Sequence, residues 1–256
     1  MSTLYYSDRD VTVWHGNALD IMPMLDPVDH VITDPPYSEK VRSTSRSRRM
    51  QSANDRGGRY GADLRRNVDL GFDHLDSETR EGAAKEFSRL ARRWVLTFSD
   101  VESCHLWRAD LEESGLDYVR TMAWRKLGGT PQFSGDRPAV AFEAITVAHQ
   151  PGRKRWNGGG KHGFYEHAIV LDRGRTGGVR LHSTQKPEPL MGAIVADFTD
   201  AGDTILDPFA GSGTTCAIAK RAGRKAVLID SREECCEVMA KRLENIGDSL
   251  FDEVGA

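Results

Sequence analysis

The chain of 256 residues is 39% hydrophobic and 29% charged, which is typical of a folded globular protein rather than a disordered or fibrous one. It contains no apolar run of about 18 residues, so we expect no membrane span. The first residues lack the basic start and apolar stretch of a signal peptide, and the four cysteines show no paired metal spacing. We therefore expect a cytoplasmic protein without a metal site.

The net charge of −3 conceals a strong asymmetry along the chain. Residues 40–66 carry a net charge of +7 and residues 150–186 a net charge of +6, which leaves −16 for the remainder. An acidic body with two basic, irregular segments indicates a surface that binds a polyanion. The alternative for either segment alone is an ordinary solvated loop.

The first half of the chain alternates between strand-like and helix-like patterns. Residues 11–34 predict a strand, a short helix and a second strand, and the polar residues 38–75 predict a long loop. Ser77 is a plausible N-cap for a helix that continues to residue 93. A buried strand at 94–98 and a helix that stops at Gly115 follow.

The second half ends in a regular alternation of strands and helices. Residues 116–126 and 139–149 predict strands, and the basic, Gly-rich residues 150–181 predict an irregular segment. A helix at 188–198 precedes the last units, which read strand 204–207, helix 214–223, strand 225–230 and helix 232–247. This alternation predicts an α/β fold with a doubly wound, mostly parallel sheet.

The sequence "DPFAGSGTT" (207–215) joins a predicted strand to a predicted helix. Gly211 and Gly213 let a ligand approach the backbone, and Asp230 ends the next strand, 23 residues after Asp207. A carboxylate there can accept hydrogen bonds from both hydroxyls of a ribose, so we expect an adenosine-type ligand. Because Asp207 leads the turn, a cationic ligand suits it better than a pyrophosphate.

The sequence "TDPPYS" (33–38) follows the strand at 28–33. Its simplest interpretation is a rigid turn, because proline fixes its own φ and restricts the preceding residue. Its alternative is a binding site that offers one carboxylate, one free backbone carbonyl and one aromatic face.

These two motifs, together with "HSTQKP" (182–187), resemble those of the amino-methylating DNA methyltransferases of the β class. The resemblance implies a Rossmann-like class I methyltransferase fold with circularly permuted motif order and S-adenosyl-L-methionine as cofactor. It implies one domain over residues 1–256, a basic loop at 38–75 and a target-recognition insertion at 128–181. Three residues depart from the family pattern: Ser183 stands where Pro is usual, Asp230 replaces the commoner Glu, and Asn17 stands where Asp is frequent.

The resemblance also implies roles for individual residues. Asp34 and the Pro35 carbonyl would accept hydrogen bonds from the exocyclic amino group of a flipped base, with Pro36 holding them rigid and Tyr37 stacking on the base. The residues expected to bind the cofactor are Asn17, Thr184, Lys186, Asp207, Phe209, Gly211, Ser212, Gly213, Thr214 and Asp230.

Double-stranded DNA is the partner that the resemblance implies, in a bacterial or phage-infected bacterial cell. The side chains expected to hold its phosphates are Arg46, Arg48, Arg49 and Arg59 on one side and Arg153, Lys154, Arg155 and Lys161 on the other. Four further residues are of types that could read base edges or support a flipped base: Trp156, Asn157, Gln132 and Arg137. Relatives are often homodimers, and a restriction endonuclease, if there is one, is a separate chain because no nuclease signature is present.

An Asp at the head of the catalytic motif points to adenine N6 as the target within this family. The alternatives are an N4-cytosine DNA methyltransferase and, from a different class, a non-catalytic nucleic-acid-binding module. The module explains the basic segments but leaves the cofactor pocket without a role.

Overall fold

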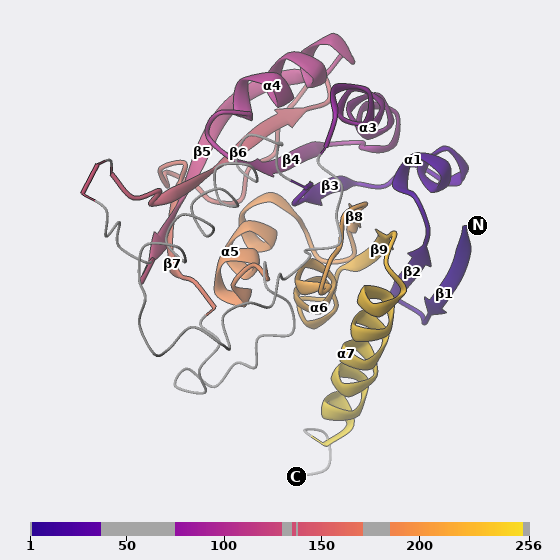
Figure 1. Cartoon of the computed structure of the whole chain (residues 1–256). Coiled ribbons are helices and arrows are strands. Elements are labelled where there is room, and N and C mark those ends of the chain that lie inside the picture. The colour runs from indigo at the N-terminus through magenta and orange to yellow at the C-terminus, as the bar shows by residue number, and fades with distance from the viewer. Residues whose placement is uncertain (1, 37–74, 130–134, 137, 171–184, 253–256) are drawn as a thin grey trace, which may run out of the picture.

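The chain folds around a nine-stranded sheet, seen in a computed structural model that describes residues 2–36, 75–129, 135–136, 138–170 and 185–252 (Figure 1). The strand order is β1-β2-β9-β8-β3-β4-β6-β5-β7. The strands are β1 (Thr3–Ser7), β2 (Val11–His15), β3 (His30–Thr33), β4 (Trp94–Ser99), β5 (Asp117–Leu127), β6 (Phe142–His149), β7 (Phe164–Ala168), β8 (Thr204–Asp207) and β9 (Lys225–Asp230).

The five central strands β2, β9, β8, β3 and β4 are parallel, so their carboxyl ends lie at one edge of the sheet. β6 runs antiparallel to both β4 and β5, and β1 runs antiparallel to β2. Ligands of open α/β sheets bind at the edge formed by the carboxyl ends. We call this the carboxyl edge, and the opposite one the amino edge.

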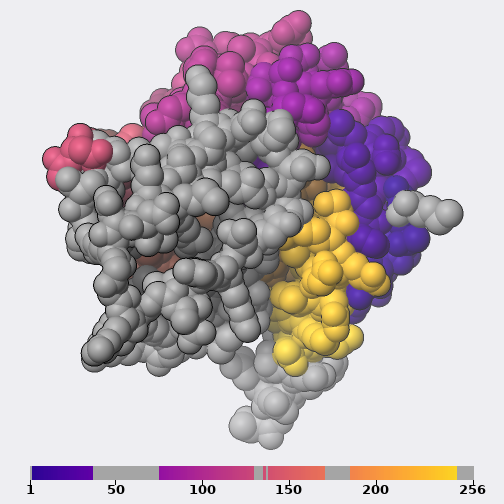
Figure 2. Space-filling view, in the orientation of Figure 1, coloured from indigo at the N-terminus to yellow at the C-terminus, as the bar shows by residue number. Residues whose placement is uncertain are grey.

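Helices cover both faces of the sheet (Figure 1). α1 (Ala18–Ile21), the 3₁₀-helix η1 (Met22–Met24), α3 (Ser77–Leu90) and α4 (Cys104–Glu113) pack on one face. The other face carries α5 (Glu188–Phe198), α6 (Thr214–Arg221) and α7 (Glu233–Asp252). Figure 2 shows α7 in yellow next to the indigo N-terminal segment, in agreement with the packing of α7 on β1 and β2.

The doubly wound α/β sheet is the fold that the alternating sequence pattern predicts, and the predicted order of elements is confirmed. Two strands differ from expectation: β1 was not predicted, and β7 lies inside the segment predicted to be irregular. Each is an edge strand with one neighbour, so it has less apolar sequence to mark it. Asp76, rather than Ser77, caps α3 by accepting a hydrogen bond of 2.7 Å from the Thr79 N–H.

The predicted recognition insertion at 128–181 includes β6, which lies inside the sheet between β4 and β5. A strand in that position belongs to the core, because Ile145 and Val147 are buried. An insertion within 128–181 is therefore limited to the segments on either side of β6 and β7. Among the described residues, no helix is both long and apolar enough to cross a membrane.

Candidate active site

The predicted catalytic strand and the predicted Gly turn lie side by side at the carboxyl edge. β3 and β8 are parallel neighbours, and each ends where one of the two motifs begins. The Thr33 hydroxyl donates a 2.8 Å hydrogen bond to Asp207 Oδ1, and the Thr215 hydroxyl donates one of 2.7 Å to Asp207 Oδ2. Asp207 therefore joins β3, the Gly turn and α6.

Both Asp207 oxygens are thus engaged inside the protein, and its side chain is buried. Burial raises the pKa of this carboxyl to about 6, against the hydrogen bonds of Thr215 and Thr33, which lower it. The carboxyl group of Asp207 lies at the turn, as the sequence predicts. Its two oxygens accept hydrogen bonds from neighbouring hydroxyls of the protein, rather than pointing to an open ligand site.

The Gly turn has the backbone that its glycines favour. Gly211 has φ +54° and Gly213, which precedes α6, has φ +70°, both in the left-handed region. A Cβ on Gly211 would meet no atom within 4 Å, whereas one on Gly213 would lie 2.6 Å from Met239 Cγ. Space for a ligand therefore lies beside Gly211.

Asp230 and Asn17 border the same turn. The Gly211 N–H donates to Asp230 Oδ2 at 2.8 Å, while Asp230 Oδ1 accepts from the Arg232 N–H and guanidinium at 3.0 and 3.2 Å. β2 places its last residue opposite Asp230, so Asn17 follows two residues later. Its side chain caps α1 through a 3.0 Å bond from the Leu19 N–H.

Three further residues of the motif lie around the turn. Phe209 is half-buried against the core beneath α1 and α3, and Ser212 is buried, with its carbonyl accepting a 3.0 Å bond from Arg242. The hydroxyl of Thr214 is buried and has no hydrogen-bond partner among the described residues. Buried polar groups are normally paired, so this hydroxyl marks a position where a ligand can bind.

Asp34 follows β3 directly, and Pro35 and Pro36 after it are buried and half-buried. The Lys186 ammonium donates a 2.6 Å hydrogen bond to Asp34 Oδ2. Asp34 Oδ1 is buried and, within the part of the chain that the structure describes, has no hydrogen-bond partner. Burial raises the pKa of the Asp34 carboxyl above its ordinary value, Lys186 opposes that rise and Glu143 adds to it.

The family model described as DNA methylase matches residues 28–242, which include both motifs and most of the chain. The chain belongs to this family, whose members methylate exocyclic amino groups (N6 or N4) in DNA. It is similar to the type II methyltransferase M2.DpnII of Streptococcus pneumoniae, with 26% identity over 95% of this chain and 93% of that protein. M2.LlaDCHI of Lactococcus lactis subsp. cremoris is 28% identical over the same shares.

Solved structures agree with this DNA methylase in fold. The M1.HpyAVI–SAM complex superposes with a TM-score of 0.66 at 22% identity and covers 91% of this chain and 98% of that one. The PvuII DNA methyltransferase, described as cytosine-N4-specific, has a TM-score of 0.69 at 14% identity, covering 96% and 93%. The class I methyltransferase fold that the motifs imply is therefore confirmed.

The structure adds two residues to the DNA methylase site that the sequence did not predict. Glu143 on β6 lies with its Oε2 2.9 Å from the Lys186 ammonium, and Lys126 on β5 contacts Glu143 Oε1 at 2.5 Å. A single acidic residue in the otherwise apolar strand 139–149 was the available signal. Lys186, predicted to bind the cofactor, contacts Asp34, and its binding of the cofactor stays a prediction.

The second set of predicted DNA-binding side chains lies away from Asp34. Lys154 pairs with Asp117 at the first residue of β5, at 2.7 Å, and Arg155 pairs with Asp200 at 3.1 Å beyond the end of α5. α5 begins two residues after Lys186, which contacts Asp34, and its eleven residues extend about 16 Å along its axis. Lys161 pairs with Asp197 in the last turn of α5, at 2.6 Å.

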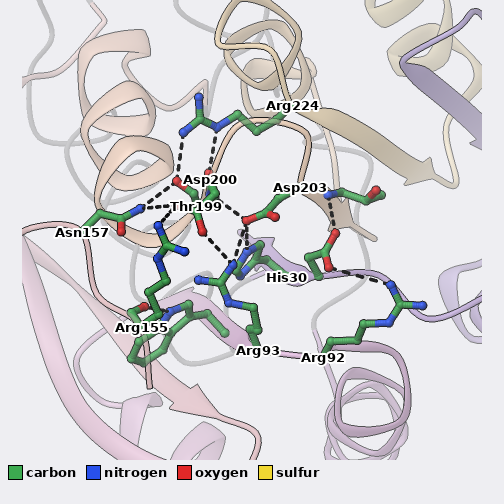
Figure 3. Close-up of polar contacts among 12 residues, drawn as sticks. His30, Arg92, Arg93, Arg155, Asn157, Thr199, Asp200, Asp203 and Arg224 are labelled. Atoms are coloured by element: carbon green, nitrogen blue, oxygen red, sulfur yellow. Dashed lines mark hydrogen bonds and ion pairs between the residues drawn. The ribbon is translucent and has the colours of Figure 1, made fainter. Parts of the chain in front are cut away.

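Arg153, in the same segment, also belongs to the amino edge, because it comes between the end of β6 and Lys154. We therefore revise the prediction for all four residues: their segment lies opposite the active site, and acids of the same protein neutralise three of their charges. Trp156 and Asn157 are likewise held internally. Trp156 packs edge-on against Phe198, and Asn157 donates to Asp200 within the polar cluster of Figure 3.

Several predicted site residues lie outside the described part of the chain. They are Tyr37, Thr184, Arg46, Arg48, Arg49, Arg59, Gln132 and Arg137.

Proposed function

We propose that this DNA methylase transfers a methyl group from S-adenosyl-L-methionine to the N6 amino group of adenine in double-stranded DNA. The assignment to adenine depends on Asp34, because in the resembling family an Asp heads the catalytic motif of adenine enzymes and Ser is commoner for cytosine. The enzyme class itself follows from the family.

The observation that carries the proposal is the buried Asp34 Oδ1 at the carboxyl edge, which has no hydrogen-bond partner among the described residues. An exocyclic amino group is a poor nucleophile, because its lone pair is delocalised into the ring. Two acceptors and no donor are needed to turn its nitrogen towards tetrahedral geometry. Asp34 Oδ1 and the Pro35 carbonyl are the acceptors that we assign, held in place by consecutive prolines.

The residues of the Gly turn fit the cofactor, which supplies an electrophilic methyl group on a sulfonium. Gly211 leaves open space beside the backbone, and Thr214 offers a buried hydroxyl without a partner in the described chain. Asp230, at the end of β9, is our assignment for the ribose hydroxyls, in competition with its bonds to Arg232. The acidic Asp207 and Asp34 suit a cationic ligand nearby.

DNA is proposed to bind at the carboxyl edge. The described residues on either side of the gaps 37–74 and 171–184, and of the partly described stretch 130–137, follow or precede elements at that edge. The most basic segment of the sequence, 40–66, lies between the described residues 36 and 75 and is itself outside the described part of the chain. Arg46, Arg48, Arg49 and Arg59 in this segment remain our candidates for phosphate contacts. A homodimer and a separate restriction endonuclease remain proposals as partners.

The first test replaces Asp34 by Ala and measures single-turnover methyl incorporation into DNA with labelled cofactor. We expect the rate to fall at least about a hundredfold, as when one preorganised group of an active site is removed. The affinity of D34A for S-adenosylmethionine, measured by calorimetry, should change little, and this result would show that the cofactor pocket is intact. Near-normal turnover of D34A would contradict the assignment.

The second test determines the target base by mass spectrometry of nucleosides from DNA methylated by the wild-type protein. N6-methyladenine is the expected product. N4-methylcytosine would overturn the adenine assignment and leave the amino-methyltransferase intact, in line with the PvuII enzyme of the same fold. Sequencing the expression host's DNA for modified bases would at the same time give the recognition sequence.

A further inference from the structure

Four charged side chains form a chain of ion pairs that leads from Asp34 into the sheet. Lys186 Nζ lies 2.6 Å from Asp34 and 2.9 Å from Glu143, and Lys126 Nζ lies 2.5 Å from the other oxygen of Glu143. β5 and β6 are paired, with Trp124 opposite Glu143, and the α5-facing side of the sheet carries these side chains together with Tyr165. This series of ion pairs ends at Lys126. The side chains at its two ends, Asp34 and Lys126, are the most exposed of the four.

Glu143 is the unusual member of this chain. Only 6% of the residue is exposed, and the strand around it, from Ala144 to Ala148, is buried. Burying a carboxylate is unfavourable unless opposite charges compensate it, and a core position in a strand is normally apolar. Two lysines compensate Glu143, and one of them is the lysine that binds Asp34. The buried carboxylate of Glu143 is thus linked to the carboxylate of Asp34 through Lys186.

We propose that Glu143 is a positioning residue that shares the Lys186 ammonium with Asp34 and so keeps Asp34 a strong acceptor for the target amine. This inference depends on the function proposed above. Without Glu143, the whole charge of Lys186 would act on Asp34, and the carboxylate would accept more weakly from a second donor. Lys126 also pairs with Glu143, so it competes with Lys186 for the Glu143 carboxylate and weakens the effect of Glu143 on Lys186.

Charge balance gives a second reason. The four groups together are neutral, and the most exposed lysine, Lys126, is partly screened by water. The amine becomes positively charged as the methyl group arrives, so a net positive cluster would oppose the reaction. Removing the charge of Glu143 would leave that net positive charge beside the reacting nitrogen. A cation–π contact also stabilises the position of Lys186, whose Nζ lies 5.0 Å from the centre of the Phe98 ring.

Glu143→Gln is the central test, read out by single-turnover methyl transfer across pH. We expect the plateau rate to fall about tenfold, which corresponds to about 1.4 kcal/mol in the activation free energy. Because the negative charge of Glu143 raises the pKa of Asp34, its loss should move the acid limb of the pH profile to lower pH. Binding of S-adenosylmethionine should not change.

Lys126→Met is the opposing variant, and its half-exposed position makes it the safer one for folding. Lys126 lowers the pKa of Asp34, so removing it should move the acid limb to higher pH. Asp110→Asn is the matched control, since Asp110 is a buried carboxylate paired with Arg80 between α3 and α4, on the face of the sheet opposite α5. It should lower stability and leave the pH profile unchanged.

Opposite shifts for E143Q and K126M, with none for D110N, support the proposal, because a purely structural role changes only the folded fraction. A profile for E143Q that coincides with wild type after correction for folded protein overturns it, as do shifts in the same direction for E143Q and K126M. D34A separates the two hypotheses: if D34A is inactive and E143Q behaves as wild type, the proposed function stands and this inference fails.

Discussion

Asp207 carries a buried carboxylate between β3, which ends just before Asp34, and the turn that leads into α6. Two hydroxyls and the Phe209 N–H donate to it, at distances of 2.7 to 3.3 Å. These neutral donors do not fully replace water, so burial still raises its pKa to about 6. The residue that joins the two motifs therefore destabilises the folded protein when it is ionised.

A pH series of unfolding tests this statement. Because the folded protein holds an extra proton between about pH 4 and pH 6, the stability that this proton confers is present at low pH and is lost as the pH rises through 6. The contribution of this group is about 3 kcal/mol. Asp207→Asn has no group that titrates here, so its stability does not fall as the pH rises from about 4 to 6. Over that range the free energy of unfolding of D207N minus that of wild type should increase by about 3 kcal/mol. Urea denaturation would measure it, and a difference that does not vary with pH contradicts the prediction.

At the scale of elements, the β8–α6 turn depends on two glycines for different reasons. Both adopt left-handed backbone, but only Gly213 faces a packed side chain, that of Met239 on α7. The turn is therefore fixed against α7 on the side of Gly213 and open on the side of Gly211. This asymmetry lets one short segment serve both the core and a ligand.

Alanine at each position separates the two roles. Gly211→Ala should cost about 1 to 2 kcal/mol for the left-handed backbone alone. Gly213→Ala adds a clash worth about 1 to 3 kcal/mol, as in other overpacked cores, and should be the less stable variant. Chemical denaturation of both variants measures the difference, with wild type as reference. Equal losses would show that Met239 moves aside freely.

At the scale of the whole molecule, charge is divided between the two edges of the sheet. The positive side chains at the amino edge are largely paired with acids, and Arg93 and Arg224 extend the same cluster around Asp200, Asp203 and Thr199 (Figure 3). The net-positive segment 40–66 lies outside the described residues, between β3 and α3, which end and begin at the carboxyl edge. We propose that the long-range field for a polyanion comes from this segment more than from the amino edge.

DNA affinity should respond accordingly. The double variant Arg153→Ala with Lys154→Ala is expected to bind a DNA duplex as wild type does. Removing Arg46, Arg48 and Arg49 should weaken binding and reduce the slope of log K against log salt by about 0.9 for each phosphate that the variant no longer neutralises. Fluorescence anisotropy over a range of salt concentrations measures both. If both variants weakened DNA binding equally, the amino edge would have to be part of the DNA-binding surface, and the prediction would be wrong.

The sequence by itself determined the order of elements, the two motifs and the family, because these depend on local patterns. Alternating apolar segments marked the buried strands. The motifs around Asp34-Pro35-Pro36 and Gly211–Gly213 resemble those of the amino-methylating DNA methyltransferases. The edge strands β1 and β7 escaped prediction since one exposed side weakens their apolar pattern.

Only the tertiary structure decided which charges meet. Lys186 and Glu143 are 43 positions apart, and Asp34 is more than 100 positions from either, yet one ammonium lies between the two carboxylates. Sequence charge could not distinguish the basic residues near 155, which neutralise acids of the amino edge, from those available to DNA. Burial and pairing depend on contacts between distant strands, and these exist only once the sheet has formed.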